Sequence, residues 1–130
     1  GRVRPFEETV SAELAWLLRA GVPPRALRLT VRELVVTRLE RGALGGREVS
    51  DAVAAAVRAA CRLVRELDAP GDVVETVCRA ALEAVRGHGG ESARWMPEAT
   101  SAVYAVLDEL AREGAAEPAW RLVARRLERW

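Results

Sequence analysis

Apolar residues recur along this chain at spacings of three and four, the periodicity of an amphipathic helix. The clearest case is residues 49–86, where Val53 and Val57 mark one stripe, and Val74 and Val77 mark another. Ala69-Pro70-Gly71 interrupts the pattern. Proline cannot continue a helix, and glycine accepts the left-handed conformation at a helix end, so we expect a reversal there. Two helices with so short a loop lie antiparallel, and this hairpin predicts the centre of a helical fold.

The same periodicity, punctuated by Gly and Pro, predicts helices at about residues 7–20, 24–42, 50–68, 71–86, 97–113 and 117–130 of a single domain, 1–130. The predicted fold class is all-α. It is an antiparallel, up-down-up-down bundle of four core helices, 24–42 to 97–113, with the first and last helices flanking it.

Helix ends follow from local chemistry. Acidic residues open the helix at 7–20, where the helix dipole favours them, and Gly21 ends it. The second helix has two candidate starts: Pro24 as a first-turn proline, or Thr30 with Glu33 as a capping box. We favour one helix from Pro24. Ser50 is the expected N-cap of the third helix.

Composition narrows the class of protein. Half of the residues are apolar and 30% are charged, which is typical of a globular domain and not of a disordered chain. The chain has no Lys, Ile, Asn or Gln, so its basic residues are all Arg, as expected of a GC-rich bacterial genome. A net charge of +1 gives no overall attraction to nucleic acid or membranes. With no transmembrane run and no signal-peptide core in the sequence, we expect a cytoplasmic protein.

Residues that carry chemistry are scarce. Cys61 and Cys78 lie at similar heights in the predicted hairpin. They are interpreted as two free thiols that behave as small apolar residues. The alternatives are a disulfide, which needs Cα atoms within about 7 Å, or a redox pair. With one His and no Cys-x-x-Cys motif, we expect no metal and no cofactor.

The last helix carries the sharpest candidate for an interaction site. Its apolar stripe and its arginines occupy separate rows; the stripe is Trp120, Val123, Leu127 and Trp130, and the arginines are Arg121, Arg125, Arg126 and Arg129. The stripe either packs on its own bundle or docks on another subunit or partner, because Trp and Arg are favoured interface anchors. A third interpretation is an anionic membrane or nucleic acid.

Two further sites are candidates. The loop after the fourth helix holds His88, Gly89, Gly90 and Trp95; it either folds Trp95 back on the core or contacts a ligand or partner. Arginine rows on two helices offer an alternative anion or nucleic-acid face, provided that they converge in space; they are Arg25, Arg28 and Arg32, and Arg58, Arg62 and Arg65.

These patterns favour a non-catalytic helical module for protein–protein interaction or scaffolding, which self-associates as a homo-oligomer. One alternative is an accessory protein that binds nucleic acid through its arginine rows. Another is a small-molecule-binding bundle or an enzyme with an apolar cavity between helices, because a pocket need leave no motif in the sequence.

Overall fold

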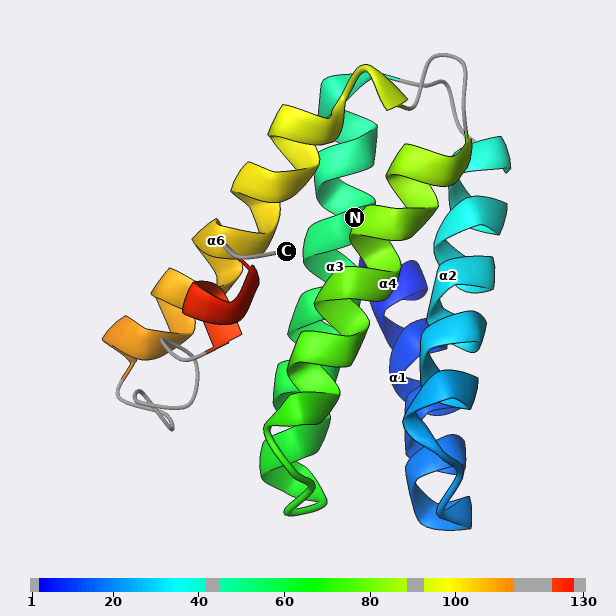
Figure 1. Cartoon of the computed structure of the whole chain (residues 1–130), viewed down its shortest axis with the longest axis vertical. Coiled ribbons are helices and arrows are strands. Elements are labelled where there is room, and N and C mark those ends of the chain that lie inside the picture. Colours follow the sequence, from blue (N-terminus) through cyan, green and yellow to red (C-terminus); the bar gives the residue numbers. More distant parts are fainter. Residues whose placement is uncertain (1–2, 42–44, 89–92, 114–122, 128–130) are drawn as a thin grey trace.

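The computed structural model describes residues 3–41, 45–88, 93–113 and 123–127, and all regular structure in these ranges is helical (Figure 1). The long helices are α1 (Val3–Ala20), α2 (Pro24–Arg41), α3 (Gly46–Glu66), α4 (Asp72–His88) and α6 (Met96–Arg112). Residues 123–127 add a short helical segment. The all-α class predicted from the apolar periodicity is confirmed.

The central element is α3, which packs against α1, α4 and α6 and more lightly against α2. Val49, Val53 and Val57 on its apolar stripe are fully buried. The alanines beside the stripe are also buried without residual exposure: Ala55, Ala56, Ala59 and Ala60. Because alanine extends so little from the helix, neighbouring helices approach α3 closely on several sides.

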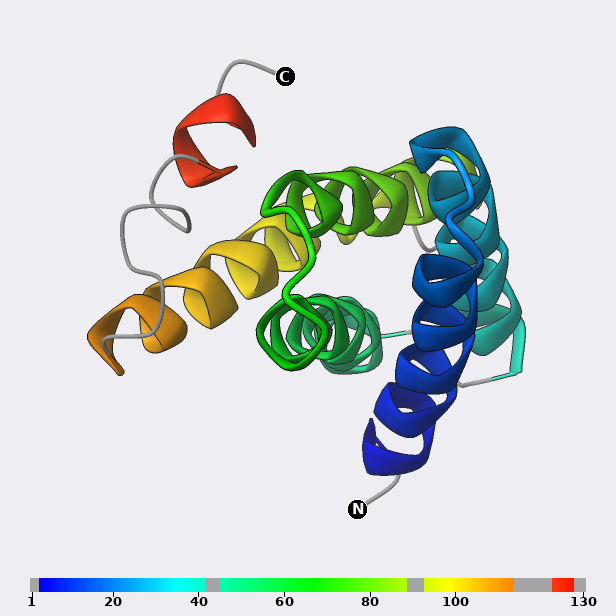
Figure 2. The same cartoon turned by 90° about the horizontal axis from the view of Figure 1, so that it is seen from below.

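Two hairpins and one further helix build the fold around α3. The α1–α2 hairpin covers one side of the α3–α4 hairpin, with α1 on α3 and α2 on α4, and α6 lies on another side of α3 (Figures 1 and 2). In Figure 2, where α3 is seen nearly end-on, α1 runs across the view and is therefore strongly inclined to α3.

The first helix is more than the flank that its sequence predicts. Val10 and Leu14 are fully buried, and α1 contacts α3 as extensively as α2 contacts α4. The expected acidic first turn is wrong, because α1 already begins at Val3 and has no acidic residue in that turn. Glu7 therefore lies within the helix, where it reaches Arg62 of α3, with Oε2 and Nη1 3.2 Å apart.

Two other predicted helix starts have opposite outcomes. α2 is one helix from Pro24, which confirms the favoured start, and Thr30 lies in its interior. Ser50 as the N-cap of α3 is wrong, because α3 begins at Gly46 with Gly45 as its N-cap. The Ser50 hydroxyl instead donates to the carbonyl of Glu98 at 3.4 Å, which joins α3 to α6.

Two helix ends contain a residue in the left-handed backbone conformation, as expected, but only one of the two is glycine. Gly21 ends α1 with φ 68°, and the N–H of Val22 donates to the carbonyl of Leu17 at 3.3 Å. The reversal after α3 is confirmed, but its left-handed residue is Asp68, with φ 51°, and not Gly71. Asp tolerates this conformation better than most residues, because its short side chain bonds locally.

Candidate interaction surface

The apolar stripe of the last predicted helix turns inward where the structure describes it. Val123 and Leu127 are only 4% and 6% exposed and belong to the hydrophobic core. Arg126 Nη1 lies 3.2 Å from Glu75 Oε1 on α4, and Arg125 is exposed. Four members of this candidate site fall outside the described residues: Trp120, Arg121, Arg129 and Trp130. The described part of the stripe thus packs on the chain's own bundle.

The loop candidate is likewise described only in part. His88 ends α4, but its side chain, Gly89 and Gly90 fall outside the description. Trp95 is partly buried and packs on the core. Its ring lies so close to Gly46 that a Cβ atom there would stand 3.1 Å from Trp95 Cε3. Trp95 therefore folds back on the start of α3, one of the two alternatives for this loop.

The arginine row on α3 lies along the edge between α1 and α6. Arg58 Nη2 is 3.4 Å from Glu109 Oε2 on α6, and Arg62 contacts Glu7 and donates to the Ser11 hydroxyl on α1. Arg65 lines the same small hollow as Arg58 and Arg62. Arg58 and Arg62 thus join α3 to α6 and α1, which is a sufficient structural reason for their presence.

The arginine row on α2 lies beside α4 instead. Arg28 Nε donates to Glu83 Oε1 at 2.6 Å, and its Nη2 donates to the other carboxylate oxygen. Because Arg28 hydrogen-bonds the charged form, the pKa of Glu83 is lowered and that of Arg28 is raised. Arg25, Arg28 and Arg32 line a hollow of about 570 Å³ together with Arg79 of α4. The two rows have their partners on different helices and line separate hollows.

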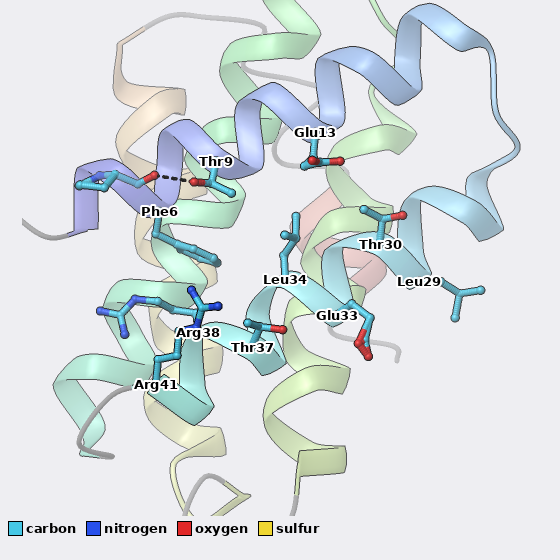
Figure 3. A pocket seen from close by; sticks show the side chains of 11 residues that line it. Phe6, Thr9, Glu13, Leu29, Thr30, Glu33, Leu34, Thr37, Arg38 and Arg41 are labelled. Carbon is cyan, nitrogen blue, oxygen red and sulfur yellow. Dashed lines mark hydrogen bonds between the residues drawn. The ribbon is translucent and has the colours of Figure 1, made fainter.

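A feature that the sequence reasoning missed is an open groove between α1 and α2 (Figure 3). It has a volume of about 770 Å³. Phe6 and Leu34 provide its apolar centre, and Thr37 lies beside Leu34 (Figure 3). The full lining is Pro5, Phe6, Thr9, Glu13, Leu29, Thr30, Glu33, Leu34, Thr37, Arg38 and Arg41.

Charge is divided between the two ends of the α1–α2 groove. Glu13 and Glu33 lie towards the α1–α2 loop, whereas Arg38 and Arg41 lie at the opposite end, near Phe6 (Figure 3). In the antiparallel hairpin, Glu13 and Glu33 both lie near the middle of their helices, closer to the α1–α2 loop than Arg38 and Arg41 do. The groove is therefore acidic at one end, apolar in the middle and basic at the other end.

Two large apolar side chains stand exposed at the acidic end of this surface. Trp16 is 68% exposed and Leu29 is 43% exposed, and these are the large exposed apolar residues of the described chain. Trp16 follows Thr9 by about two helical turns, so it continues the groove-lining face of α1. The signal in the sequence was a tryptophan on the polar side of an amphipathic helix; it was overlooked in favour of the tryptophans at 120 and 130.

Other chemistry is limited in the described part of the chain. It holds no group of three or more His, Cys, Asp or Glu placed to bind a metal ion. Cys61 and Cys78 are both free and buried. Burial raises the pKa of Cys61 to about 12, and burial also raises the pKa of Cys78. Neither thiol is poised to react as a nucleophile, because the thiolate is the reactive form.

None of the described helices is both long enough and apolar enough to cross a membrane. Comparison of the chain with protein-family models, with curated proteins and with solved structures finds no match in any of the three. Among the surfaces of the described residues, the α1–α2 groove with the exposed Trp16 and Leu29 beside it is the best-developed site.

Proposed function

We propose that this chain is a non-catalytic helical module for protein–protein interaction that self-associates through its α1–α2 face. Its scaffold is an antiparallel, up-down-up-down core of α2, α3, α4 and α6, on which α1 packs. The observation that carries the proposal is the 68% exposure of Trp16 on the face of α1 that lines the open α1–α2 groove. The free, buried thiols fit a cytoplasmic setting, where disulfides are rare.

The energetic reason is the cost of leaving Trp16 in water. A tryptophan buries about 150–250 Å² when it is fully covered, so its exposed two-thirds corresponds to about 140 Å². At about 25 cal/mol per Å², covering that area contributes about 3.5 kcal/mol. Trp is also the residue type most enriched among the side chains that dominate binding energy at interfaces.

The charged groups on the same face as Trp16 support recognition of a specific partner rather than nonspecific association. Glu13 and Glu33 flank the apolar residues at one end, and Arg38 and Arg41 flank them at the other. Such a polar rim around an apolar centre is the usual anatomy of a protein interface. The C-terminal stripe offers less, because its described apolar members, Val123 and Leu127, are already buried.

Light scattering on the full chain tests this proposal. We expect concentration-dependent self-association, and we expect Trp16→Ser with Leu29→Ser to abolish it while the helical content stays unchanged. The matched comparison is Arg125→Glu, which alters the exposed part of the C-terminal row and should leave association intact. A full chain that stays monomeric at every concentration, or one in which only Arg125→Glu disrupts association, contradicts the proposal.

A second candidate function, anion or nucleic-acid binding, has support at the hollow between α2 and α4. Arg25, Arg28, Arg32 and Arg79 gather around it from two helices. Its weakness is internal neutralisation, because Arg28 is already paired with Glu83. If the hollow binds nucleic acid, Arg25→Glu with Arg32→Glu abolishes binding, whereas Arg58→Glu with Arg65→Glu leaves it intact. A nucleic-acid affinity that does not change with salt concentration would argue against this function.

A further inference from the structure

The separation of charge along the α1–α2 groove restricts what fits it. An occupant must present positive charge to Glu13 and Glu33, apolar side chains to the centre, and negative charge to Arg38 and Arg41. A second copy of the groove, turned end for end, presents this pattern of charged and apolar groups. A surface that is acidic at one end and basic at the other is complementary to its own copy rotated by half a turn about an axis through its middle.

We propose that a second copy of this chain occupies the α1–α2 groove, related by a two-fold axis that sets the Glu13/Glu33 end of each groove on the Arg38/Arg41 end of the other. This inference rests on the proposed self-association and names its partner surface and register. Each contact then occurs twice, as in any isologous interface. The opposite register, with like ends together, would place arginines against arginines and glutamates against glutamates.

Shape complements charge in this arrangement. Trp16 is exposed on the part of the face nearer the acidic end, and the buried Phe6 ring lines the groove near Arg38 towards the basic end (Figure 3). The half-turn brings the Trp16 indole of one copy towards the groove of the other copy near Phe6. There the Arg38 and Arg41 guanidinium groups of that copy can stack on the indole, since arginine is the cation most often found on a tryptophan face. The same half-turn covers the exposed Leu29 side chain.

The size of the face predicts a modest affinity. α1 and α2 each have 18 residues and are therefore about 27 Å long. Two packed helices span about 20 Å in width, so the footprint is about 500 Å² per copy and about 1,000 Å² in total. Specific interfaces usually bury at least about 1,200 Å², so we expect a reversible dimer with a dissociation constant in the micromolar range or weaker.

Charge reversal at one end of the groove provides the decisive test. Glu13→Arg with Glu33→Arg makes both ends basic, and Arg38→Glu with Arg41→Glu makes both ends acidic. For each double variant alone, the dissociation constant of the dimer measured by sedimentation velocity should rise by about tenfold or more. The reason is that ends of the same charge then face each other. An equimolar mixture of the two should restore a dimer, and native mass spectrometry should show one copy of each variant in it.

A matched control separates the local effect from net charge. Asp108→Arg near the end of α6 with Glu113→Arg directly after it changes the net charge as much as the basic variant does, at exposed positions away from the groove, and should leave dimerisation unchanged. If both groove variants dimerise like the unmodified chain, or if their mixture stays monomeric, the two-fold arrangement is wrong. If Trp16→Ser with Leu29→Ser still abolishes association in that case, the α1–α2 face is the interface, and only the proposed two-fold register is wrong.

Cysteine trapping covers the outcome in which a reversal variant fails to fold. Glu13→Cys and Arg41→Cys are exposed single substitutions, and the native cysteines are buried. Mixed under mild oxidation, the two variants should form the disulfide between positions 13 and 41 in preference to either symmetric disulfide. Preferential 13–13 or 41–41 bridging would overturn the register.

Discussion

Because its two thiols are buried, we expect this chain to lose more stability at alkaline pH than a variant without cysteines does. Cys61 and Cys78 have no exposed surface. Burial is the main cause that raises both pKa values, that of Cys61 from 9.0 to about 12. The folded chain therefore retains these protons at a pH where the unfolded chain releases them. Because the unfolded state binds fewer protons, stability falls as pH rises above about 9.

The magnitude follows from the two pKa values of Cys61. Between pH 9 and pH 12 the loss per pH unit approaches about 1.4 kcal/mol, which is the energy of one pKa unit. At about pH 10 Cys61 alone therefore lowers the free energy of unfolding by about 1.4 kcal/mol. Cys78 adds to the loss in the same direction, because its pKa is also raised. Below about pH 8 neither thiol contributes to the pH dependence.

Urea unfolding at about pH 7 and about pH 10 measures this effect in the native chain and in a Cys61→Ala/Cys78→Ala variant. The stability lost between the two pH values should be larger in the native chain by at least about 1 kcal/mol. The two proteins share every other ionisable group, so the difference isolates the thiols. Equal losses in the two proteins would refute the reasoning and show that the thiols are not desolvated. Thiol reagents should modify neither cysteine at neutral pH without unfolding.

Three further predictions concern the fold. Gly21→Ala should lower stability by about 1 kcal/mol, because Gly21 has φ 68°. Gly87→Ala in helical α4, with open space around it, should instead raise stability by about 0.5 kcal/mol. Melting temperatures that shift in the same direction in both variants would contradict the backbone conformations given for these two glycines. Leu14→Ala should cost about 3 kcal/mol in urea unfolding, because Leu14 is fully buried; a loss typical of an exposed site would show that α1 does not pack on α3. Arg28 lowers the pKa of Glu83 through a hydrogen bond, so their pair stabilises the fold at neutral pH and this contribution fades as pH falls through the lowered pKa. Glu83→Gln should reduce this acid dependence, and an unchanged acid titration would contradict the role of the pair.

Sequence periodicity predicted the helices well because it reports local burial. The reversal at Pro70, the single helix from Pro24 and the break at Gly21 all depend on residues within one or two turns. Helix starts were less predictable. Ser50 has the right side chain for a cap, yet α3 continues to Gly46, where the absence of a side chain admits the Trp95 ring. That contact joins residues from different helices, and no local pattern contains it.

The candidate site was the least predictable part, because a surface is defined by what the other helices leave uncovered. Val123 and Leu127 have the spacing of an interface stripe, but they are buried in this chain's own core. Trp16 has no distinctive spacing, but it remains exposed beside the α1–α2 groove. The two arginine rows look alike in sequence, yet one joins α3 to α1 and α6, and the other joins α2 to α4.

Residue spacing and the positions of Gly and Pro are enough to predict that this protein is helical and which side of most helices is apolar. Which helices cover which faces depends on the packed fold, and so does the open α1–α2 face with opposite charges at its two ends. The physical reason is that amphipathicity specifies a face to be buried without specifying its partner. The choice of partner depends on contacts between residues far apart in the chain.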